Sequence, residues 1–336
     1  MTSAMASISK PSSCASTTGS ARRTLLARFH SLGDVILATG IALRLVDAGE
    51  GIDVVTAERF LPVFEGLPLR DLWTPSRLGV SAGRFDRIVD LQANETSRRL
   101  LDSLGPCRRN RARSLARRWL VFWGRRSPLP RIPHAVQRYA EAAGVREAEA
   151  RRLRPRVVVT ERDREEAQRF PQAWDATQGT CVGLAEGGSR RMKRWPQGRY
   201  DALAEALASS GIRSLRFLEP DGVPWEAPGA VRASLRPLKA LVERCAVLVT
   251  SDSGVMHLAV ALGVPVAALF GSTVLDFGFG PLGERDRVLS RDLPCRPCAV
   301  HGARFCWQGH GRCLREISVE DVLQVTLGLV DGGHER

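Results

Sequence analysis

Apolar and polar positions along the chain follow a repeated pattern of strand, turn, helix and turn. In the clearest repeat, the apolar, β-branched run 246–250 has strand length and is followed by the small polar turn 251–254. Residues 255–262 are apolar on all sides, as a buried helix would be, and Gly263 stands where a left-handed helix stop is typical. A second apolar strand follows at 266–270. The pattern predicts a β-α-β unit.

The two turns of this unit leave the carboxyl ends of parallel strands, which is the edge where open α/β sheets bind ligands. Asp252 and Ser253 stand at the helix start, where free N–H groups and the helix dipole favour an anion such as phosphate. His257, one turn further on, can lean back toward the same place. Alternatively, Asp252 and Ser253 only cap the helix and His257 lies on the surface. The intact DSG-x-x-H cluster and the second turn Gly271-Ser272-Thr273 favour a ligand site.

A similar unit begins the chain. A short apolar strand at 24–29 leads through a Gly-containing turn to Asp34 and an amphipathic helix at 35–46. Asp34 therefore lies on the ligand edge, although an acid at this place also complements the helix dipole. Further strands are predicted at 52–56, 86–90, 180–185 and 215–218, and further helices at 198–208 and 235–244.

Length and composition are those of a globular α/β protein with two domains. A chain of 336 residues that is 44% hydrophobic can build two cores. We expect domains at 22–150 and 151–328, preceded by a disordered extension at 1–21, although the acid-free composition of that extension also imitates a transit peptide. No apolar stretch is long enough to span a membrane. Eight cysteines without a recognisable signal peptide indicate a reducing compartment.

The net charge of +13 is concentrated in one segment. Residues 96–131 contain eleven arginines and a single acid, Asp102. Within it, 111–126 interleaves Leu, Phe and Trp with a basic face, which is typical of a helix on a membrane surface. The arginines can also meet anionic groups of a substrate, or nucleic acid. Because no recognised nucleic-acid module accompanies them, we favour membrane contact through 98–131.

One of only three lysines follows a flexible loop. The turn Glu186-Gly187-Gly188-Ser189 comes after a predicted strand, and Lys193 lies four residues beyond Ser189. A Gly-Ser loop with a nearby lysine suits a diphosphate, because the lysine acts as a mobile point charge. The alternative is an ordinary surface lysine in a basic loop.

Four of the eight cysteines fall in the Cys-rich loop, residues 293–315. They are Cys295, Cys298, Cys306 and Cys313. The first two have zinc-knuckle spacing, whereas the later gaps of seven and six residues are less usual. A zinc ion held by four thiolates would be structural, since no coordination position stays open for chemistry. Reduced thiols in an irregular loop are the alternative, with a disulfide between the first two less expected in a reducing compartment.

Several short motifs occur together in one order along the chain. They are SLGDV at 31–35, DLQ-x-N at 90–94, HAV-x-RY at 134–139, K-x-WP at 193–196, DSG-x-MHLA at 252–259 and LFG-x-T at 269–273. With these motifs the chain resembles glycosyltransferase family 9, the heptosyltransferases of the lipopolysaccharide inner core. The resemblance covers most of residues 23–325.

The resemblance implies the GT-B architecture, in which two Rossmann-like, doubly wound domains face each other across a cleft and the C-terminal domain holds the donor. It implies an inverting transferase that needs no metal or other cofactor for catalysis and uses ADP-heptose. By position, Asp34 corresponds to the catalytic base. The donor-binding positions are Ser189, Lys193, Asp252, Ser253, Gly254 and His257. The chain departs from the family pattern at Ala93, where glycine is usual, at Val255, where proline is common, and at Phe29-His30.

We therefore expect transfer of a heptose from ADP-heptose to a lipid-linked saccharide acceptor, the Kdo/heptose inner core of lipopolysaccharide. The expected location is the cytoplasmic face of the inner membrane, bound peripherally. Two alternatives stay open at this stage. One is a GT-B transferase for another nucleotide sugar or glycan acceptor, and the other is a basic membrane-binding or nucleic-acid-binding protein whose sugar site has decayed.

Overall fold

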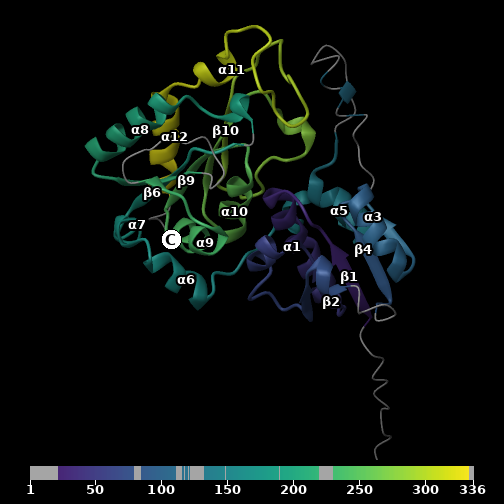
Figure 1. The fold of residues 1–336 in the computed structure, drawn as a ribbon. Helices are drawn as coiled ribbons and strands as arrows, with labels where there is room; N and C mark the ends of the chain where they lie inside the picture. The colour runs from purple at the N-terminus through teal and green to yellow at the C-terminus, as the bar shows by residue number, and fades with distance from the viewer. Residues whose placement is uncertain are drawn as a thin grey trace, which may run out of the picture.

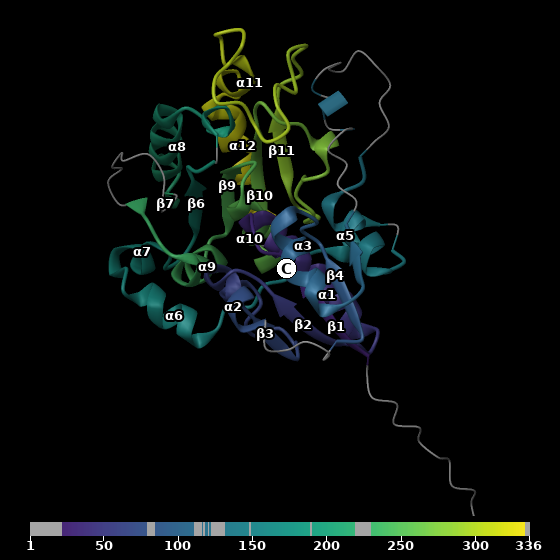
Figure 2. The same ribbon diagram turned by 45° about the vertical axis from the view of Figure 1, so that its right-hand side comes forward.

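Two parallel β-sheets, each covered by helices, make up the chain (Figure 1). The computed structural model describes residues 22–78, 85–110, 132–147, 149–188, 190–218 and 230–332, together with 116, 118, 119 and 121. Figure 2 shows the two halves as separate layers that meet along one side, with the helices α1 and α10 at the junction. This is the expected arrangement of two doubly wound α/β domains.

The first sheet has five strands in the order β3-β2-β1-β4-β5, and the pairs β1–β2, β1–β4, β2–β3 and β4–β5 are all parallel. Its elements are β1 Arg23–Ala27, α1 Leu32–Asp47, β2 Gly51–Val55, the 3₁₀ helix η1 Glu58–Val63, β3 Asp71–Trp73, α2 Pro75–Leu78, β4 Arg87–Asp90, α3 Glu95–Leu101, η2 Asp102–Leu104, β5 Cys107–Arg109 and α5 Ala135–Ala143.

The second sheet has six strands in the order β11-β10-β9-β6-β7-β8, again all parallel. Its elements, after η4 Ala150–Leu153, are α6 Glu161–Gln168, α7 Pro171–Ala176, β6 Cys181–Ala185, η5 Arg191–Lys193, α8 Gln197–Ser209, β7 Arg213–Phe217, β8 Ala230–Val231, α9 Leu235–Glu243, β9 Val247–Ser251, α10 Gly254–Leu262, β10 Val266–Phe270, η6 Leu275–Phe277, β11 Arg287–Ser290, α11 Arg312–Arg315 and α12 Val319–Asp331.

The apolar runs of the sequence become the buried central strands. Every residue of β6, β9 and β10 is buried, because helices cover both faces of a parallel sheet. Helix α10 buries most of its length and ends at Gly263, whose φ of 83° confirms the predicted left-handed stop. The short strands β3, β5 and β11 and the helices α6, α7 and α12 were not predicted.

The two domains touch where α1 and α10 begin, and only glycine fits there. A Cβ added to Gly33 would lie 2.7 Å from Cδ2 of His257, and a Cβ added to Gly254 would lie 2.8 Å from Cβ of Leu32. Such contacts are far closer than van der Waals distance. The absence of two side chains therefore lets the first turns of α1 and α10 meet directly, one from each sheet.

Helix α9 joins the domains through a buried charge network. Lys239 is fully buried, lies 2.7 Å from Oδ2 of Asp163, and donates to the carbonyl oxygens of Pro62 (2.7 Å) and Val158 (3.0 Å). One turn earlier, both outer nitrogens of Arg236 donate to the carboxylate of Glu65. Because Pro62 and Glu65 belong to the first domain and α9 to the second, these bonds fix the domains against each other. We propose a domain boundary near residue 150, between them.

Two expectations lie mostly outside the described residues. The extension 1–21 is outside them entirely, and of the basic segment 111–126 only 116, 118, 119 and 121 are described, all of them helical. Within the described part of the chain, no helix combines the length and the apolarity needed to cross a membrane.

Candidate functional site

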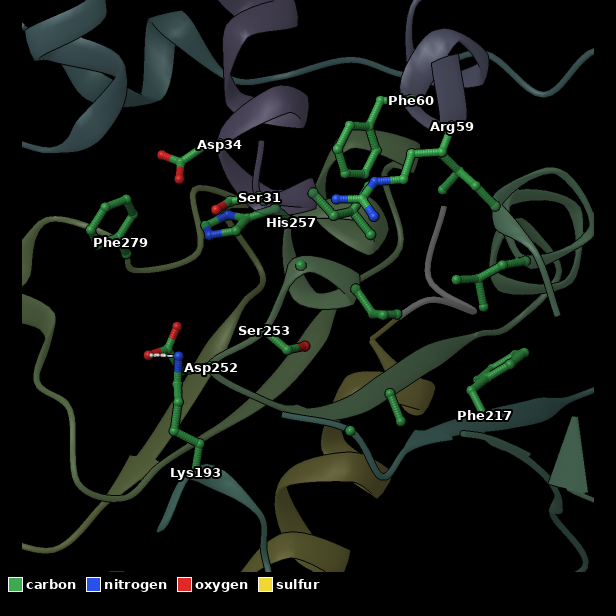
Figure 3. A pocket seen from close by; sticks show the side chains of 18 of the residues that line it. Ser31, Asp34, Arg59, Phe60, Lys193, Phe217, Asp252, Ser253, His257 and Phe279 are labelled. Atoms are coloured by element: carbon green, nitrogen blue, oxygen red, sulfur yellow. Dashed lines mark ion pairs between the residues drawn. The ribbon is translucent and has the colours of Figure 1, made fainter. Parts of the chain in front are cut away.

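A cavity of about 800 Å³ lies between the domains at the carboxyl ends of the strands. The first domain contributes the start of α1 and η1, and the second contributes the start of α10, the loop after β6 and the start of α9. Figure 3 shows Asp34, Ser31 and His257 on one side of this space and the pair Lys193–Asp252 on another. The cavity therefore gathers most of the residues singled out from the sequence.

Asp34 is held by two donors from elements far apart in the chain. It lies in the first turn of α1, where Tyr139 Oη donates to its Oδ1 at 2.5 Å and Arg28 Nη2 pairs with its Oδ2 at 2.7 Å. Burial, together with the charge of Asp34, raises the pKa of Tyr139, so its hydroxyl keeps its proton. Each carboxylate oxygen still has a free lone pair in this arrangement, so Asp34 can accept a proton while its orientation is fixed.

The start of α10 points into the cavity without a side-chain cap. Ser253 is the N-cap residue, but its side chain makes no capping hydrogen bond, and its hydroxyl lies 3.3 Å from that of Thr250. The first N–H groups of a helix have no partner within the helix. The interpretation of Ser253 as only a cap is therefore wrong, and the helix start is available to an anion.

Lys193 and Asp252 form an ion pair at the cavity wall. Lys193 Nζ lies 2.8 Å from Asp252 Oδ2, and Thr273 from the second small-residue turn donates to the same oxygen at 2.7 Å. Both charged side chains are largely buried. Lys193 is therefore no ordinary surface lysine. The two turns predicted to share one edge are joined by this bond between Thr273 and Asp252.

His257 is a buried residue, which excludes the surface alternative. It is 4% exposed and lies against Gly33 of the other domain. Burial lowers the pKa of His257 to about 4, although the charges of Asp252 and Asp34 act in the opposite direction. The imidazole is therefore neutral at pH 7 and can offer a hydrogen bond, but no positive charge, to a ligand.

The far wall of the cavity is apolar. Phe217 and Leu218 at the end of β7, Ala233 before α9, and Leu235 and Leu238 on α9 line it. Figure 3 shows Phe217 there, on the side away from Asp34. An apolar wall next to a cationic group and a helix start suits a flat aromatic base carried by phosphates.

Two residues that hold Asp34, Arg28 and Tyr139, were not predicted from the sequence. A signal for both was present, since Arg28 lies three residues before the SLGDV motif and Tyr139 ends the HAV-x-RY motif. Neither motif says that its residue contacts Asp34. Among the predicted site residues, Ser189 lies outside the described residues, so its position stays a prediction.

Ala93, one of the departures from the family pattern, occupies a conformation that favours glycine. Its φ is 55°, a left-handed value that few residues other than glycine adopt. The backbone N–H groups of Gln92 and Ala93 donate to Oδ1 of Asp90, and Oε1 of Gln92 accepts from the N–H groups of Phe29 and His30. The loop thus keeps the shape that glycine would allow, and it supports the turn that leads to Asp34.

The four cysteines of the Cys-rich loop are the candidate ligands of a structural zinc ion. Among the described residues, no three Cys, His, Asp or Glu side chains are arranged to hold a metal ion. Burial raises the pKa of Cys298 to about 11. Cys306 differs, because backbone N–H groups of residues 308–311 outweigh its burial and lower its pKa. The four thiols are free in this structure, and zinc binding by them stays an untested prediction.

Comparison with known proteins identifies the family. A family model described as glycosyltransferase family 9 (heptosyltransferase) matches residues 77–220 and 230–307, which is more than half of the chain. The chain belongs to glycosyltransferase family 9. Five of the six motifs lie within the matched residues, and SLGDV at 31–35 lies before them.

The sequence identity to individual members of glycosyltransferase family 9 is low and covers only part of the chain. Lipopolysaccharide heptosyltransferase 2 of Salmonella typhimurium is 32% identical over 126 residues, which are 33% of this chain and 35% of that protein. The matched segments of such relatives thus span about a third of their length.

Solved structures of family members share the fold. A family 9 glycosyltransferase from Veillonella parvula superposes with a TM-score of 0.72 at 23% identity, covering 93% of this chain and 98% of that one. The ADP-heptose lipopolysaccharide heptosyltransferase II of Escherichia coli gives a TM-score of 0.67 at 21% identity, with coverage of 93% and 99%. The predicted GT-B architecture is therefore confirmed.

Proposed function

We propose that the protein is an inverting glycosyltransferase that moves a heptose from ADP-heptose to the inner core of lipopolysaccharide. The observation that carries this proposal is the meeting of two kinds of group in one cavity. The first domain offers a carboxylate, Asp34, while the second offers a cation and a free helix start at Lys193 and Ser253. The relatives named as heptosyltransferases support the choice of sugar.

In this mechanism Asp34 accepts the proton of an acceptor hydroxyl as its oxygen attacks the anomeric carbon. The new C–O bond forms on the face opposite the nucleotide, the bond from the anomeric carbon to the diphosphate oxygen breaks, and ADP leaves with the bonding electrons. Arg28 and Tyr139 hold the carboxylate in one orientation. Attack from the opposite face inverts the anomeric configuration.

Negative charge grows on the departing diphosphate, and groups of the second domain can stabilise that charge. The N–H groups at the start of α10 and the ammonium of Lys193 can stabilise that charge. Asp252 would repel a diphosphate, so we assign it to hydroxyl groups of the sugar. The neutral imidazole of His257 can donate a hydrogen bond to the sugar. The apolar wall around Phe217 binds the adenine.

We also propose that the enzyme works at the cytoplasmic face of the inner membrane. The acceptor carries a lipid anchor in this proposal, and the arginines of 98–131 bring positive charge toward anionic lipid or toward the acid groups of Kdo. Catalysis needs no metal ion in this proposal, so chelators should leave the rate unchanged.

The test is turnover of ADP-heptose with a truncated, Kdo-containing acceptor, followed by mass spectrometry. The Asp34→Asn variant keeps the size and the Tyr139 contact but cannot act as a base, so its kcat should fall about 10²- to 10⁴-fold while ADP affinity by calorimetry stays unchanged. An Asp47→Asn variant at the exposed end of the same helix is the matched control.

Near wild-type turnover by Asp34→Asn would remove Asp34 from its assigned role. If the wild-type enzyme ignored ADP-heptose and turned over another nucleotide sugar in a donor panel, the proposed donor would be wrong while the assignment of the cavity would stand.

A further inference from the structure

Two aromatic side chains stand out from the tip of the Cys-rich loop. Phe305 is 63% exposed and Trp307 is 75% exposed, with their ring centroids 5.5 Å apart. Among the described residues, only two other large hydrophobic side chains are exposed, Trp119 at 52% and Leu275 at 47%. Adjacent exposed aromatics of this size are typical of an interaction surface, unlike single exposed apolar residues.

The loop that carries the two rings is held against the second domain by hydrogen bonds and buried side chains. Cys306, between them, accepts the N–H of Gly311 on its sulfur at 3.3 Å. Cys313 and Leu314 are buried in the core of the second domain, and Arg296 is buried and donates to the carbonyl oxygen of Thr273 at 2.6 Å. The rings are therefore presented outward by an anchored loop, and their exposure is a property of the fold.

The surroundings of the rings are positively charged. The Cys-rich loop contains four arginines and no acid, and three of the arginines, Arg304, Arg312 and Arg315, are exposed. Arg312 pairs with Glu316, whereas Arg304 and Arg315 add positive charge near the rings. Aromatic rings combined with arginines are the side chains found where proteins meet an anionic lipid surface.

One described residue of the arginine-rich segment, Val121, lies against the same loop. Val121 lines a cavity of about 420 Å³ together with Cys295, Cys298 and Trp307. Trp119, two residues before Val121, is the third exposed aromatic residue. Figure 1 and Figure 2 both show the helical fragment at 118–119 at the same end of the molecule as the loop before α11. The two domains thus present aromatic and basic groups at one end.

We propose that Phe305, Trp307 and Trp119, with the arginines around them, form a docking face for an anionic phospholipid surface. The rings enter the interfacial layer of the lipid and the arginines contact its headgroups. The other arm of the loop, Val300 and His301, lines the central cavity. Docking therefore places the cavity beside the membrane, where a lipid-linked acceptor can reach it. The choice of acceptor rests on the proposed function, but docking to lipid does not.

The experiment measures cosedimentation of the full chain with phosphatidylcholine vesicles that contain or lack phosphatidylglycerol. The double variant Phe305→Ala/Trp307→Ala should bind anionic vesicles at least about tenfold more weakly than the wild type, because it removes both apolar rings that would enter the lipid. Phe305→Trp and Trp307→Phe should keep binding. Leu275→Ala, which removes an exposed apolar side chain elsewhere, is the matched control and should bind as the wild type does.

Charge is tested separately with Arg304→Gln/Arg315→Gln, which should weaken binding to anionic vesicles and make it less sensitive to salt. Turnover of a lipid-free acceptor should be unchanged in all these variants, so a failure of docking is distinguishable from a failure of the proposed reaction.

Three results would overturn the docking face. One is unchanged vesicle binding by the double aromatic variant, provided its thermal unfolding matches the wild type. Another is equal binding to neutral and anionic vesicles. The third is loss of self-association in that variant with vesicle binding retained, which would assign the rings to contact between copies of the chain.

Discussion

Replacing Lys239 by Met is the sharpest test of the buried charge network around α9. Methionine has a similar length and no charge, so it fills the space with little new cavity. The substitution removes the ion pair to Asp163 and the hydrogen bonds to Pro62 and Val158. Asp163 then stays buried without its lysine.

The magnitude follows from what Asp163 retains. Removing one partner of a buried ion pair typically costs about 3–5 kcal/mol, because the remaining charge is left uncompensated. Asp163 keeps hydrogen bonds from the N–H of Thr160 at 2.8 Å and from Arg236 at 3.2 Å, so we expect a cost near the lower end, about 3 kcal/mol. For domains of this size, that corresponds to a fall in melting temperature of about 6–12 °C.

The control lies on the same two helices. Arg164 of α6 pairs with Glu243 of α9 at 3.2 Å, but their side chains are 39% and 38% exposed. Exposed pairs contribute at most about 1 kcal/mol, so Arg164→Met should lower the melting temperature by no more than about 4 °C. Scanning calorimetry compares the variants. Because α9 also lines the cavity, Lys239→Met should raise KM for the donor, and Arg164→Met should not.

Equal melting temperatures for Lys239→Met and Arg164→Met would refute the reasoning. A double variant, Lys239→Met/Asp163→Asn, adds a second check. It removes the uncompensated charge and should recover part of the stability lost by Lys239→Met.

Three further predictions concern the cavity and two buried histidines, His134 and His257. Asp252→Ala releases Lys193 from its ion pair, so calorimetry should find the ADP affinity unchanged or higher. The kcat/KM for the sugar nucleotide should fall at least about tenfold. Equal losses for both ligands would contradict the assignment of Lys193 to the diphosphate and Asp252 to the sugar. Tyr139→Phe removes one of the two donors to Asp34, so kcat should fall roughly tenfold with KM nearly constant. Tyr139→Leu should also lower the stability of the fold. An unchanged kcat in Tyr139→Phe would mean that Arg28 alone orients the carboxylate. Burial holds the pKa of both His134 and His257 at about 4, below the ordinary value of 6.5, so protonation favours the unfolded chain. Stability should therefore be complete above about pH 6.5 and fall as the pH drops toward about 4, by up to roughly 3 kcal/mol for each histidine, and melting curves of His257→Gln should show a smaller loss than the wild type.

The parts of the fold that were predicted correctly have a strong local signal. The run that became β9, α10 and β10 is apolar, β-branched and bounded by small residues, so it reveals burial and turns together. Strand β3 has only three residues, with one exposed and one half-buried, and such a strand has no detectable period. Helix α6 was missed because its sequence is almost entirely polar. One of its two buried residues is the charged Asp163, which only the fold pairs with Lys239.

The site divides in the same way. Asp34 and Asp252 were found because each follows a strand, and topology alone brings the carboxyl ends of parallel strands together. The contact between Asp34 and Tyr139 joins residues 105 positions apart, and no spacing rule reports such a contact. The ion pair between Lys193 and Asp252 was missed for the same reason, since each residue was interpreted from its own loop.

The glycine contact at the domain junction bears on the construction of hybrid enzymes. If the proposed function is right, exchanging the first domain for that of a relative would change the acceptor and keep the part that binds the donor. Each sheet is built only from strands of its own half of the chain, so such hybrids should fold. An active hybrid also needs the two domains to approach as closely as they do here. That approach depends on Gly33 and Gly254, because a Cβ at either position would clash with the opposite domain. A relative that supplies the first domain must therefore carry glycine at the position of Gly33, or Asp34 would lie farther from Asp252 and Ser253 of the second domain.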